Sequence, residues 1–417
     1  MKKTIWYTLA AILICFNFAC NKADTSEAEE VKPAEPINLT TRQAEKANTD
    51  NAFSFKMFKE VSALAKEPNT FFSPLSLNMA LGMLYNGTSG ETRTEMEEVL
   101  GMAGFSETEI NEYYQKMSQA LLKIDPLTEI SIANSIWYRI GFPVKQPFID
   151  INKKYFDAEV KSLDFKKSDA ADIINKWCAE KTKNRIKEIV ESPIGDDIVM
   201  YLINALYFKS KWQFEFDKKN TKRDDFTKVG NQKVKVNMME QTTTLPYYAD
   251  QYLQCVEMPY GNEAFSMVAI LPADNMNIDQ LIEHLDNDKW QNVVSNLYER
   301  NVWVKFPRFK IECDIPLKEP VKNVGMKRIF EADGGLSNIA DADLFVSNIK
   351  QKTFVEVNEE GTEAAAVTAI EIGVTSYDPN AKPQSIQFFA DRPFLYLIKE
   401  KSTGAILFIG RMDEPKE

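Results

Sequence analysis

Residues 359–375, with the sequence EEGTEAAAVTAIEIGVT, form the stretch on which the interpretation of the whole chain depends. A period of two separates small and apolar side chains from a second set that includes Glu363 and Glu371. The first set consists of Thr362, Ala364, Ala366, Thr368, Ile370 and Ile372. No proline lies between Gly361 and Tyr377, so each residue there keeps the backbone N–H that a central strand needs. Because three consecutive alanines would also suit a short helix, this segment alone leaves helix and strand open.

The segments on either side favour the strand. Upstream, residues 352–358 (KTFVEVN) alternate β-branched and aromatic residues with polar ones, which is typical of a strand. Downstream, Pro379 and Pro383 indicate irregular chain before residues 385–389, which again have strand character. A strand is therefore expected to run into an exposed, proline-free segment of small residues that could later join the same sheet.

Residues 357–366 read Val-Asn-Glu-Glu-Gly-Thr-Glu-Ala-Ala-Ala, and they resemble the hinge of the serpins without a mismatch. Serpins are protease inhibitors whose reactive loop inserts into their own central sheet. The resemblance implies a hinge made of Glu359, Glu360, Gly361, Thr362, Glu363, Ala364, Ala365 and Ala366. Neither proline nor a bulky charge occurs in residues 364–368, which favours an inhibitor over a serpin-fold protein with a binding or structural role.

Motifs elsewhere in the chain follow the order of the same family. Residues 69–76 (NTFFSPLS) predict a short strand that leads into a helix, with Ser73 as its N-cap. Residues 198–208 are almost continuously apolar, as expected of a strand covered on both faces, and they lead into a family signature that ends at Trp212.

The resemblance covers about residues 45–413 and implies one α+β domain with the serpin fold. In that fold, helices pack around a large central mixed β-sheet, smaller sheets complete the domain, and a reactive-centre loop is exposed. The loop is expected at about residues 359–384.

The resemblance also assigns five residues to the region where the central sheet opens. They are Ser73, Ser76, Asn204, Trp212 and Gln351. Many serpins have a histidine at the position of Gln351. Since an amide donates and accepts hydrogen bonds at once, Gln351 is expected to replace that histidine near Ser73, Ser76 and Asn204 and to remove its pH sensitivity.

The family's usual offset of fourteen residues from Gly361 places the reactive bond between Thr375 and Ser376. The chain that follows is longer than in many relatives, so Val374 and Tyr377 remain alternative recognition residues. Val374 and Thr375 suit a small apolar protease pocket of the elastase or subtilisin kind, whereas Tyr377 would suit a chymotrypsin-like one.

Residues 362–381 contain no Lys or Arg, which argues against trypsin-like targets. The resemblance therefore implies a suicide inhibitor of serine endopeptidases that forms a covalent acyl complex with its target. Papain-like cysteine proteases are expected as secondary targets, and the inhibitor itself is expected to be a monomer.

Composition and chemistry exclude several other classes of protein. The 417 residues include 50 Lys and Arg against 61 Asp and Glu, and a net charge of −11 argues against nucleic acid as a partner. The one histidine, His284, has no evident orienting partner for a catalytic triad. No phosphate-binding loop, His-Glu-x-x-His or Cys-x-x-Cys motif occurs, so we expect no catalytic residue, metal or cofactor. Cys178, Cys255 and Cys313 are expected to be free thiols.

The first residues have the pattern of an export signal. Lys2 and Lys3 precede an apolar run over residues 5–19, which is too short to span a membrane. Residues 1–19 are interpreted as a signal peptide, Cys20 as the acylated anchor of a bacterial lipoprotein, and residues 20–44 as an acidic linker. Because Asn17 departs from the lipoprotein pattern, ordinary cleavage stays open.

These features predict an exported protein on the outer membrane or cell surface, held there only through its lipid, or otherwise a periplasmic or secreted one. Two other functions compete with the inhibitor. One is a non-inhibitory serpin-fold protein with a binding or structural role, and the other is an unrelated surface enzyme that processes glycans.

Overall fold

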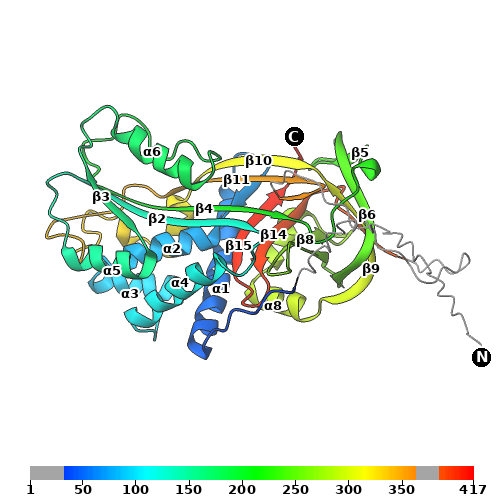
Figure 1. Cartoon of the computed structure of the whole chain (residues 1–417), viewed down its shortest axis with the longest axis horizontal. Coiled ribbons are helices and arrows are strands. Elements are labelled where there is room, and N and C mark those ends of the chain that lie inside the picture. Colours follow the sequence, from blue (N-terminus) through cyan, green and yellow to red (C-terminus); the bar gives the residue numbers. More distant parts are fainter. Residues whose placement is uncertain (1–31, 363–384) are drawn as a thin grey trace, which may run out of the picture. The chain divides into compact units, whose positions relative to one another are not determined.

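The structure is a computed structural model that describes residues 32–362 and 385–417. From Pro33 onward these residues form one folded unit, built from two sheets with helices around them (Figure 1).

The first sheet is the one into which the hinge enters. Its strands lie in the order β10-β11-β12-β4-β2-β3. It is mixed, because β2 pairs in parallel with β3 and antiparallel with β4. The strands are β2 (Glu129–Arg139), β3 (Glu159–Leu163), β4 (Met200–Lys211), β10 (Phe309–Pro316), β11 (Lys350–Asn358) and β12 (Gly361–Thr362).

The second sheet lies in the order β1-β15-β14-β8-β7-β6-β9-β13, and β5 pairs with β6 beside this row. The strands are β1 (Thr70–Phe72), β5 (Lys222–Thr227), β6 (Lys233–Ala249), β7 (Leu253–Pro259), β8 (Phe265–Pro272), β9 (Tyr298–Pro307), β13 (Ile386–Phe389), β14 (Phe394–Glu400) and β15 (Ile406–Met412).

The chain also forms nine α-helices within the described residues, which lie before or between the strands in sequence. They are α1 (Thr41–Leu64), α2 (Pro74–Tyr85), α3 (Gly90–Val99), α4 (Glu107–Leu121), α5 (Gln146–Phe156), α6 (Ala170–Lys181), α7 (Ile278–His284), α8 (Asn287–Ser295) and α9 (Lys318–Asn323). Two short 3₁₀ helices, η1 (Lys218–Asn220) and η2 (Arg328–Phe330), complete the set within the described residues. As predicted, Ser73 caps α2, since its side chain accepts a hydrogen bond from the backbone of Ser76.

Strand β4 is covered on both faces, which confirms the expectation from its continuous apolar sequence. Leu206 and Phe208 belong to the main core on the side of α2. Ile203 and Ala205 point to the other face, where they join a smaller apolar cluster with residues of α6. Figure 1 shows α2 and α6 on opposite sides of this sheet. A strand added next to β4 would therefore place every second side chain over the main core on the side of α2.

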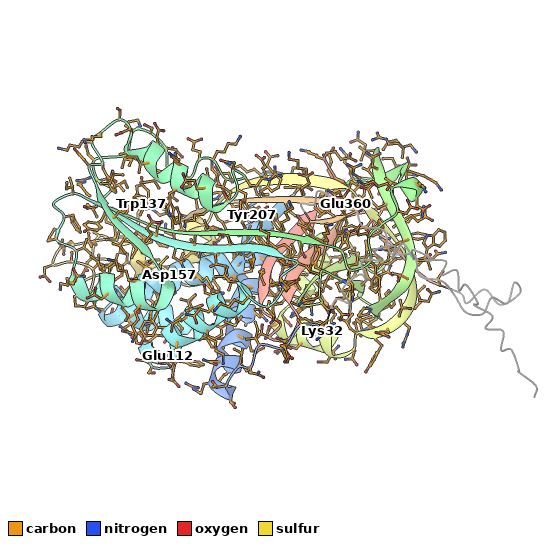
Figure 2. All side chains as sticks on the ribbon, viewed as in Figure 1. Lys32, Glu112, Trp137, Asp157, Tyr207 and Glu360 are labelled. Carbon is orange, nitrogen blue, oxygen red and sulfur yellow. The ribbon has the colours of Figure 1, made fainter. Side chains whose placement is uncertain are left out.

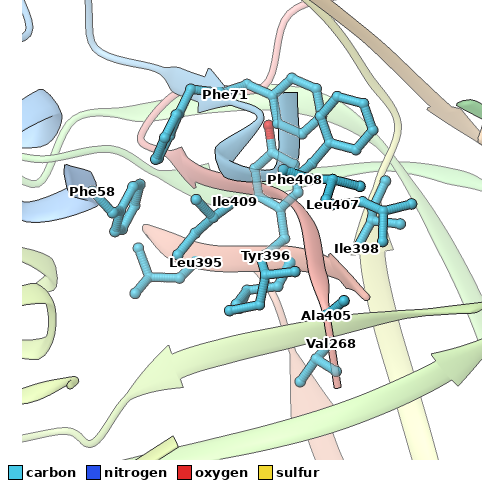
Figure 3. Close-up of a cluster of buried hydrophobic side chains, with 14 of the residues drawn as sticks. Phe58, Phe71, Val268, Leu395, Tyr396, Ile398, Ala405, Leu407, Phe408 and Ile409 are labelled. Carbon is cyan, nitrogen blue, oxygen red and sulfur yellow. The ribbon is translucent and has the colours of Figure 1, made fainter. Parts of the chain in front are cut away.

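The main core continues into the second sheet, where buried apolar side chains of several strands form a cluster (Figure 3). Phe71 of β1 stacks on Tyr396 and Phe408, with ring centroids 5.6 and 4.9 Å apart. These contacts hold β1, and with it the start of α2, against β14 and β15 of the second sheet.

Helix α1 begins at Thr41, a few residues before the domain boundary expected at about residue 45. Thr40 and Gln43 form a reciprocal capping box there. The first turn lacks apolar periodicity, so the apolar pattern did not reveal it. Part of the expected linker also lies on the folded unit, since the backbone N–H of Ala34 donates to the carbonyl of Asn262 at 2.9 Å.

Candidate functional site

The candidate site is an open slot in the first sheet, between β4 and β11. Each of these strands is paired along its outer edge, β4 with β2 and β11 with β10. Within the described residues, no backbone ladder joins β4 to β11 directly, and only the two residues of β12 lie between them. In the described part of the chain, most of the two facing edges therefore has no partner strand, and such edges are able to accept one.

A cavity of about 600 Å³ occupies this slot. Its walls are residues 198–206, mostly from β4, and residues 350–353 of β11, and its floor includes Leu77, Leu81 and Leu84 of α2. Cys178 also lines it, and burial raises the pKa of this thiol to about 12, so the thiol stays protonated at neutral pH. The cavity has the lining that an apolar strand would need.

Gly361 occupies the entrance of the slot. Its backbone has φ +152°, and it pairs with Lys211 on one side and Asn358 on the other. A Cβ atom at this position would lie 2.1 Å from the carbonyl oxygen of Ser210. Only glycine therefore fits here without moving the neighbouring strand.

Thr362 is the last described residue of the hinge, and its side chain points into the core. Its hydroxyl lies 2.6 Å from the hydroxyl of Tyr260, and both residues are buried. Burial raises the pKa of Tyr260 far above its usual value, so this phenol remains protonated. The inward face predicted for the hinge thus begins at Thr362.

Trp212 supports the turn that precedes the hinge strand. Its indole N–H donates to the carbonyl of Asn358 at 2.9 Å, and its ring stacks on Tyr260 with centroids 4.5 Å apart. The backbone N–H groups of Trp212 and Phe216 donate to the carbonyls of Glu360 and Glu359, each at 2.9 Å. The chain after β4 therefore holds the hairpin turn that sends the hinge into the slot.

The side chain of Glu359 is held at the same turn. Its Oε1 accepts a hydrogen bond from the hydroxyl of Thr221 at 2.7 Å, and its Oε2 lies 3.7 Å from Nε of Arg308. Such partners replace the water that a nearly buried carboxylate loses.

Further along the slot, Gln351 and Ser73 form a paired contact. Oε1 of Gln351 accepts from the backbone N–H of Ser73 at 2.7 Å, while Nε2 donates to the carbonyl of Ser73 at 3.0 Å. The hydroxyl of Ser73 donates to the carbonyl of Leu407 at 2.7 Å. One amide thus ties β11 to the start of α2.

Asn204 lies in the wall of the same cavity but does not bond to Gln351 through its side chain. Its Nδ2 donates to Asn134 Oδ1 at 2.7 Å, and the hydroxyl of Ser76 lies 3.5 Å from its carbonyl oxygen. Oδ1 of Asn204 is buried, and the described residues offer it no hydrogen-bond donor. The expected group of five residues is thus split, with Trp212 at the hinge and the others deeper in the slot.

Several expected site residues lie outside the described part of the chain. They are Cys20, Glu363, Ala364, Ala365, Ala366, Val374, Thr375, Ser376 and Tyr377.

Sequence analysis did not identify Tyr260, Thr221, Lys218 or Arg308, all of which contact the hinge or its turn. Tyr260 is 102 residues from Thr362 in sequence, and Lys218 is 142 residues from Glu360. The one available signal was charge, because the positive charge of Lys218, shortly after Trp212, is opposite to that of the hinge glutamates.

Across residues 32–362 and 385–417, no three His, Cys, Asp or Glu side chains gather in a way that could hold a metal ion. In the same ranges, no helix combines the length and apolar character that crossing a bilayer requires. His284 ends α7 and stacks on Tyr252, with ring centroids 4.0 Å apart.

Comparisons with known proteins agree with this architecture. The family model described as "Serpin (serine protease inhibitor)" matches residues 48–415. Iripin-1 of Ixodes ricinus is 34% identical over 371 residues, covering 87% of this chain and 93% of that protein. Human neuroserpin is 34% identical over 381 residues, covering 87% of this chain and 90% of its own. The native structure of the thermophilic serpin Tengpin superposes with a TM-score of 0.80 at 30% identity, covering 92% of this chain and 97% of Tengpin.

Proposed function

Because the chain belongs to the serpin family and has the serpin fold, we propose that it is a suicide inhibitor of serine endopeptidases. The serine of the target attacks the carbonyl carbon of Thr375, an acyl bond to the enzyme forms, and the amine of Ser376 leaves. The freed strand then enters the slot between β4 and β11 and carries the attached protease with it. This chain contributes no catalytic group, since the target supplies the nucleophile and the base.

The observation that carries this proposal is the position of β12 at the entrance of the slot. Gly361 pairs with Lys211 and Thr362 pairs with Ser210. If the cleaved loop continues this register, the residues of its inward face come opposite residues of β4 that point into the main core. These pairs are Ala364 with Phe208, Ala366 with Leu206, Thr368 with Asn204, Ile370 with Leu202 and Ile372 with Met200.

In the same register, each inserted side chain would meet residues of β4 and β11 with similar polarity. Thr368 would arrive between Asn204 and Gln351, the polar level, where Oδ1 of Asn204 has no donor among the described residues. Ile370 and Ile372 would arrive at the apolar levels beyond it. This agreement between loop and slot supports insertion in one defined register.

Insertion would release enough free energy to disturb a bound enzyme. Ten further residues would make on the order of ten ladder hydrogen bonds at about 1 kcal/mol net each. Burial of the two isoleucines would add roughly 2 kcal/mol apiece. An inserted strand of about fifteen residues would also move the protease by roughly 50 Å, at ~3.3 Å per residue.

We also propose targets of the elastase or subtilisin kind, with cysteine proteases as secondary targets and a monomeric inhibitor. The absence of Lys and Arg from residues 362–381 supports this choice. The test is to mix the full chain with elastase and run a denaturing gel. A complex that survives denaturation, with cleavage after Thr375 by mass spectrometry, is the expected result. Plain cleavage of the loop without a complex would favour the non-inhibitory alternative.

We propose further that the protein is exported and anchored through an acylated Cys20. Intact mass of the protein extracted from membranes should show the lipid on Cys20, and Cys20→Ala should release the protein from the membrane fraction. An unmodified N-terminus in the membrane extract would contradict this proposal.

A further inference from the structure

Two consecutive glutamates form the turn between β11 and β12, and both are almost buried. Glu359 is 4% exposed and Glu360 is 8% exposed. Glu360 lies two residues beyond the end of β11 and directly before β12, at the place labelled in Figure 2. Two adjacent carboxylates in such a place repel each other unless cations neutralise them.

The two glutamates are neutralised from different directions. Glu359 is held by Thr221 and Arg308, as described above. Glu360 accepts a hydrogen bond from the ammonium of Lys218, on the 3₁₀ helix η1 that follows Trp212. This hydrogen bond raises the pKa of Lys218, so the ammonium remains charged at neutral pH.

Lys218 differs from the other partners in its exposure. Its side chain is 60% exposed, whereas the side chain of Glu360 is 11% exposed. These groups border a polar hollow of about 520 Å³. The cation of this pair is therefore open to solvent and salt, while its carboxylate is not.

The position of this turn determines whether β12 can stay in the slot. Gly361 follows Glu360 directly, and it pairs with Lys211 and Asn358 on its two sides. A turn that moves outward would withdraw Gly361 and Thr362 from both strands.

We propose that Lys218 is a positioning residue for the hinge: by holding Glu360, it keeps the first two residues of the loop in the slot. The effect on inhibition rests on the proposed function, whereas the effect on the hinge itself does not. Since insertion must begin at β12, loss of Lys218 should delay it. A delay gives the protease time to hydrolyse the acyl bond and leave, which turns the inhibitor into a substrate.

The direct test compares amide hydrogen exchange across residues 357–362 in the intact full chain and in Lys218→Gln. Exchange should become about two- to fivefold faster in the variant, the range expected for a partly exposed ion pair. Lys219→Gln is the matched control, since Lys219 is the next residue, is exposed, and has no side-chain hydrogen bond or ion pair within the described residues. Lys218→Arg should restore slow exchange.

The second readout is the number of inhibitor molecules consumed for each protease molecule trapped. Lys218→Gln should raise this number about two- to fivefold, and Lys219→Gln should leave it unchanged. Raising the salt concentration from roughly 0.05 to 0.5 M should increase this number for the original protein toward that of the variant. The reason is that salt screens the attraction between the exposed ammonium of Lys218 and Glu360.

Equal exchange in Lys218→Gln and the original protein would overturn the proposal. An equal change in Lys219→Gln would overturn it as well, because the effect would then come from net charge. If hydrogen exchange becomes faster in Lys218→Gln but the original protein traps no protease, the role of Lys218 in positioning the hinge is supported. The proposed inhibitory function is then contradicted.

Discussion

At Gly361, both the backbone conformation and the close approach of a neighbouring strand require glycine. Its φ of +152° is unfavourable for other residues, and a Cβ atom would meet the carbonyl of Ser210 at 2.1 Å. Together with the two glutamates before it, this residue directs the loop between two strands instead of away from them.

Gly361→Ala should therefore remove β12 from the slot. We expect the yield of trapped protease to fall at least about fivefold, since strain of this kind costs on the order of 1–3 kcal/mol. The measurement is the ratio of trapped complex to cleaved inhibitor on a denaturing gel.

Gly404→Ala is the control for that substitution. Gly404 also has a positive φ, +70°, but a Cβ atom there would meet nothing closer than 3.9 Å. Equal loss of trapping in both variants would contradict a specific role for Gly361.

Gln351 makes a second prediction at the scale of the residue. Its amide accepts from the backbone N–H of Ser73 and donates to the carbonyl of the same residue. In Gln351→His, the backbone N–H of Ser73 needs an acceptor, which only the neutral imidazole offers. A protonated ring would instead direct an N–H toward this donor, so the folded state should lower the pKa of the new histidine. The unfolded chain would then bind more protons, so stability should fall as the pH drops through about 6.5.

Chemical denaturation at pH 5.5 and 7.5 measures this effect. The variant should lose about 1 kcal/mol more than the original protein on acidification, comparable to one hydrogen bond. The single native histidine contributes its own pH dependence, because burial lowers the pKa of His284 and its protonation destabilises the fold as the pH falls. Measuring His284→Gln in the same way gives the size of this background contribution. A Gln351→His protein with no added pH dependence would contradict the contact with Ser73.

At the scale of the element, the two faces of the inserted strand should tolerate charge differently. Ala366→Arg would place a cation opposite Leu206 in the main core, so insertion should fail and the protein should behave as a substrate. Glu371→Arg puts the same side chain on the other face, which already carries a charge, and should preserve most trapping. Equal trapping by both variants would contradict the register proposed from β12.

The sequence predicted the elements around the hinge better than it predicted their contacts. The strand over residues 352–358, the N-cap at Ser73 and the doubly covered strand β4 are confirmed, because local pattern and composition determine them. The support of the turn by Tyr260 and Lys218 could not be predicted, since these residues are more than a hundred positions away in sequence.

At the scale of the whole molecule, the slot itself could not be predicted from the sequence. Whether β4 and β11 pair with each other or stay apart depends on two strands about 150 residues apart in sequence and on the helices beneath them. The apolar pattern of the two strands would be the same whether they pair with each other or stay apart, so it does not reveal the slot. Among residues 32–362 and 385–417, the facing edges of β4 and β11 therefore have no partner strand beyond β12, which is a property of the assembled fold.

Thermal unfolding of the intact protein and of the protein cleaved in its loop tests this account most directly. If the cleaved loop fills the slot, on the order of 10 kcal/mol of added stability should raise Tm by 10 °C or more. Ala366→Arg cleaved in the same way should show little of this increase. A cleaved protein that unfolds at or below the temperature of the intact one would contradict the account.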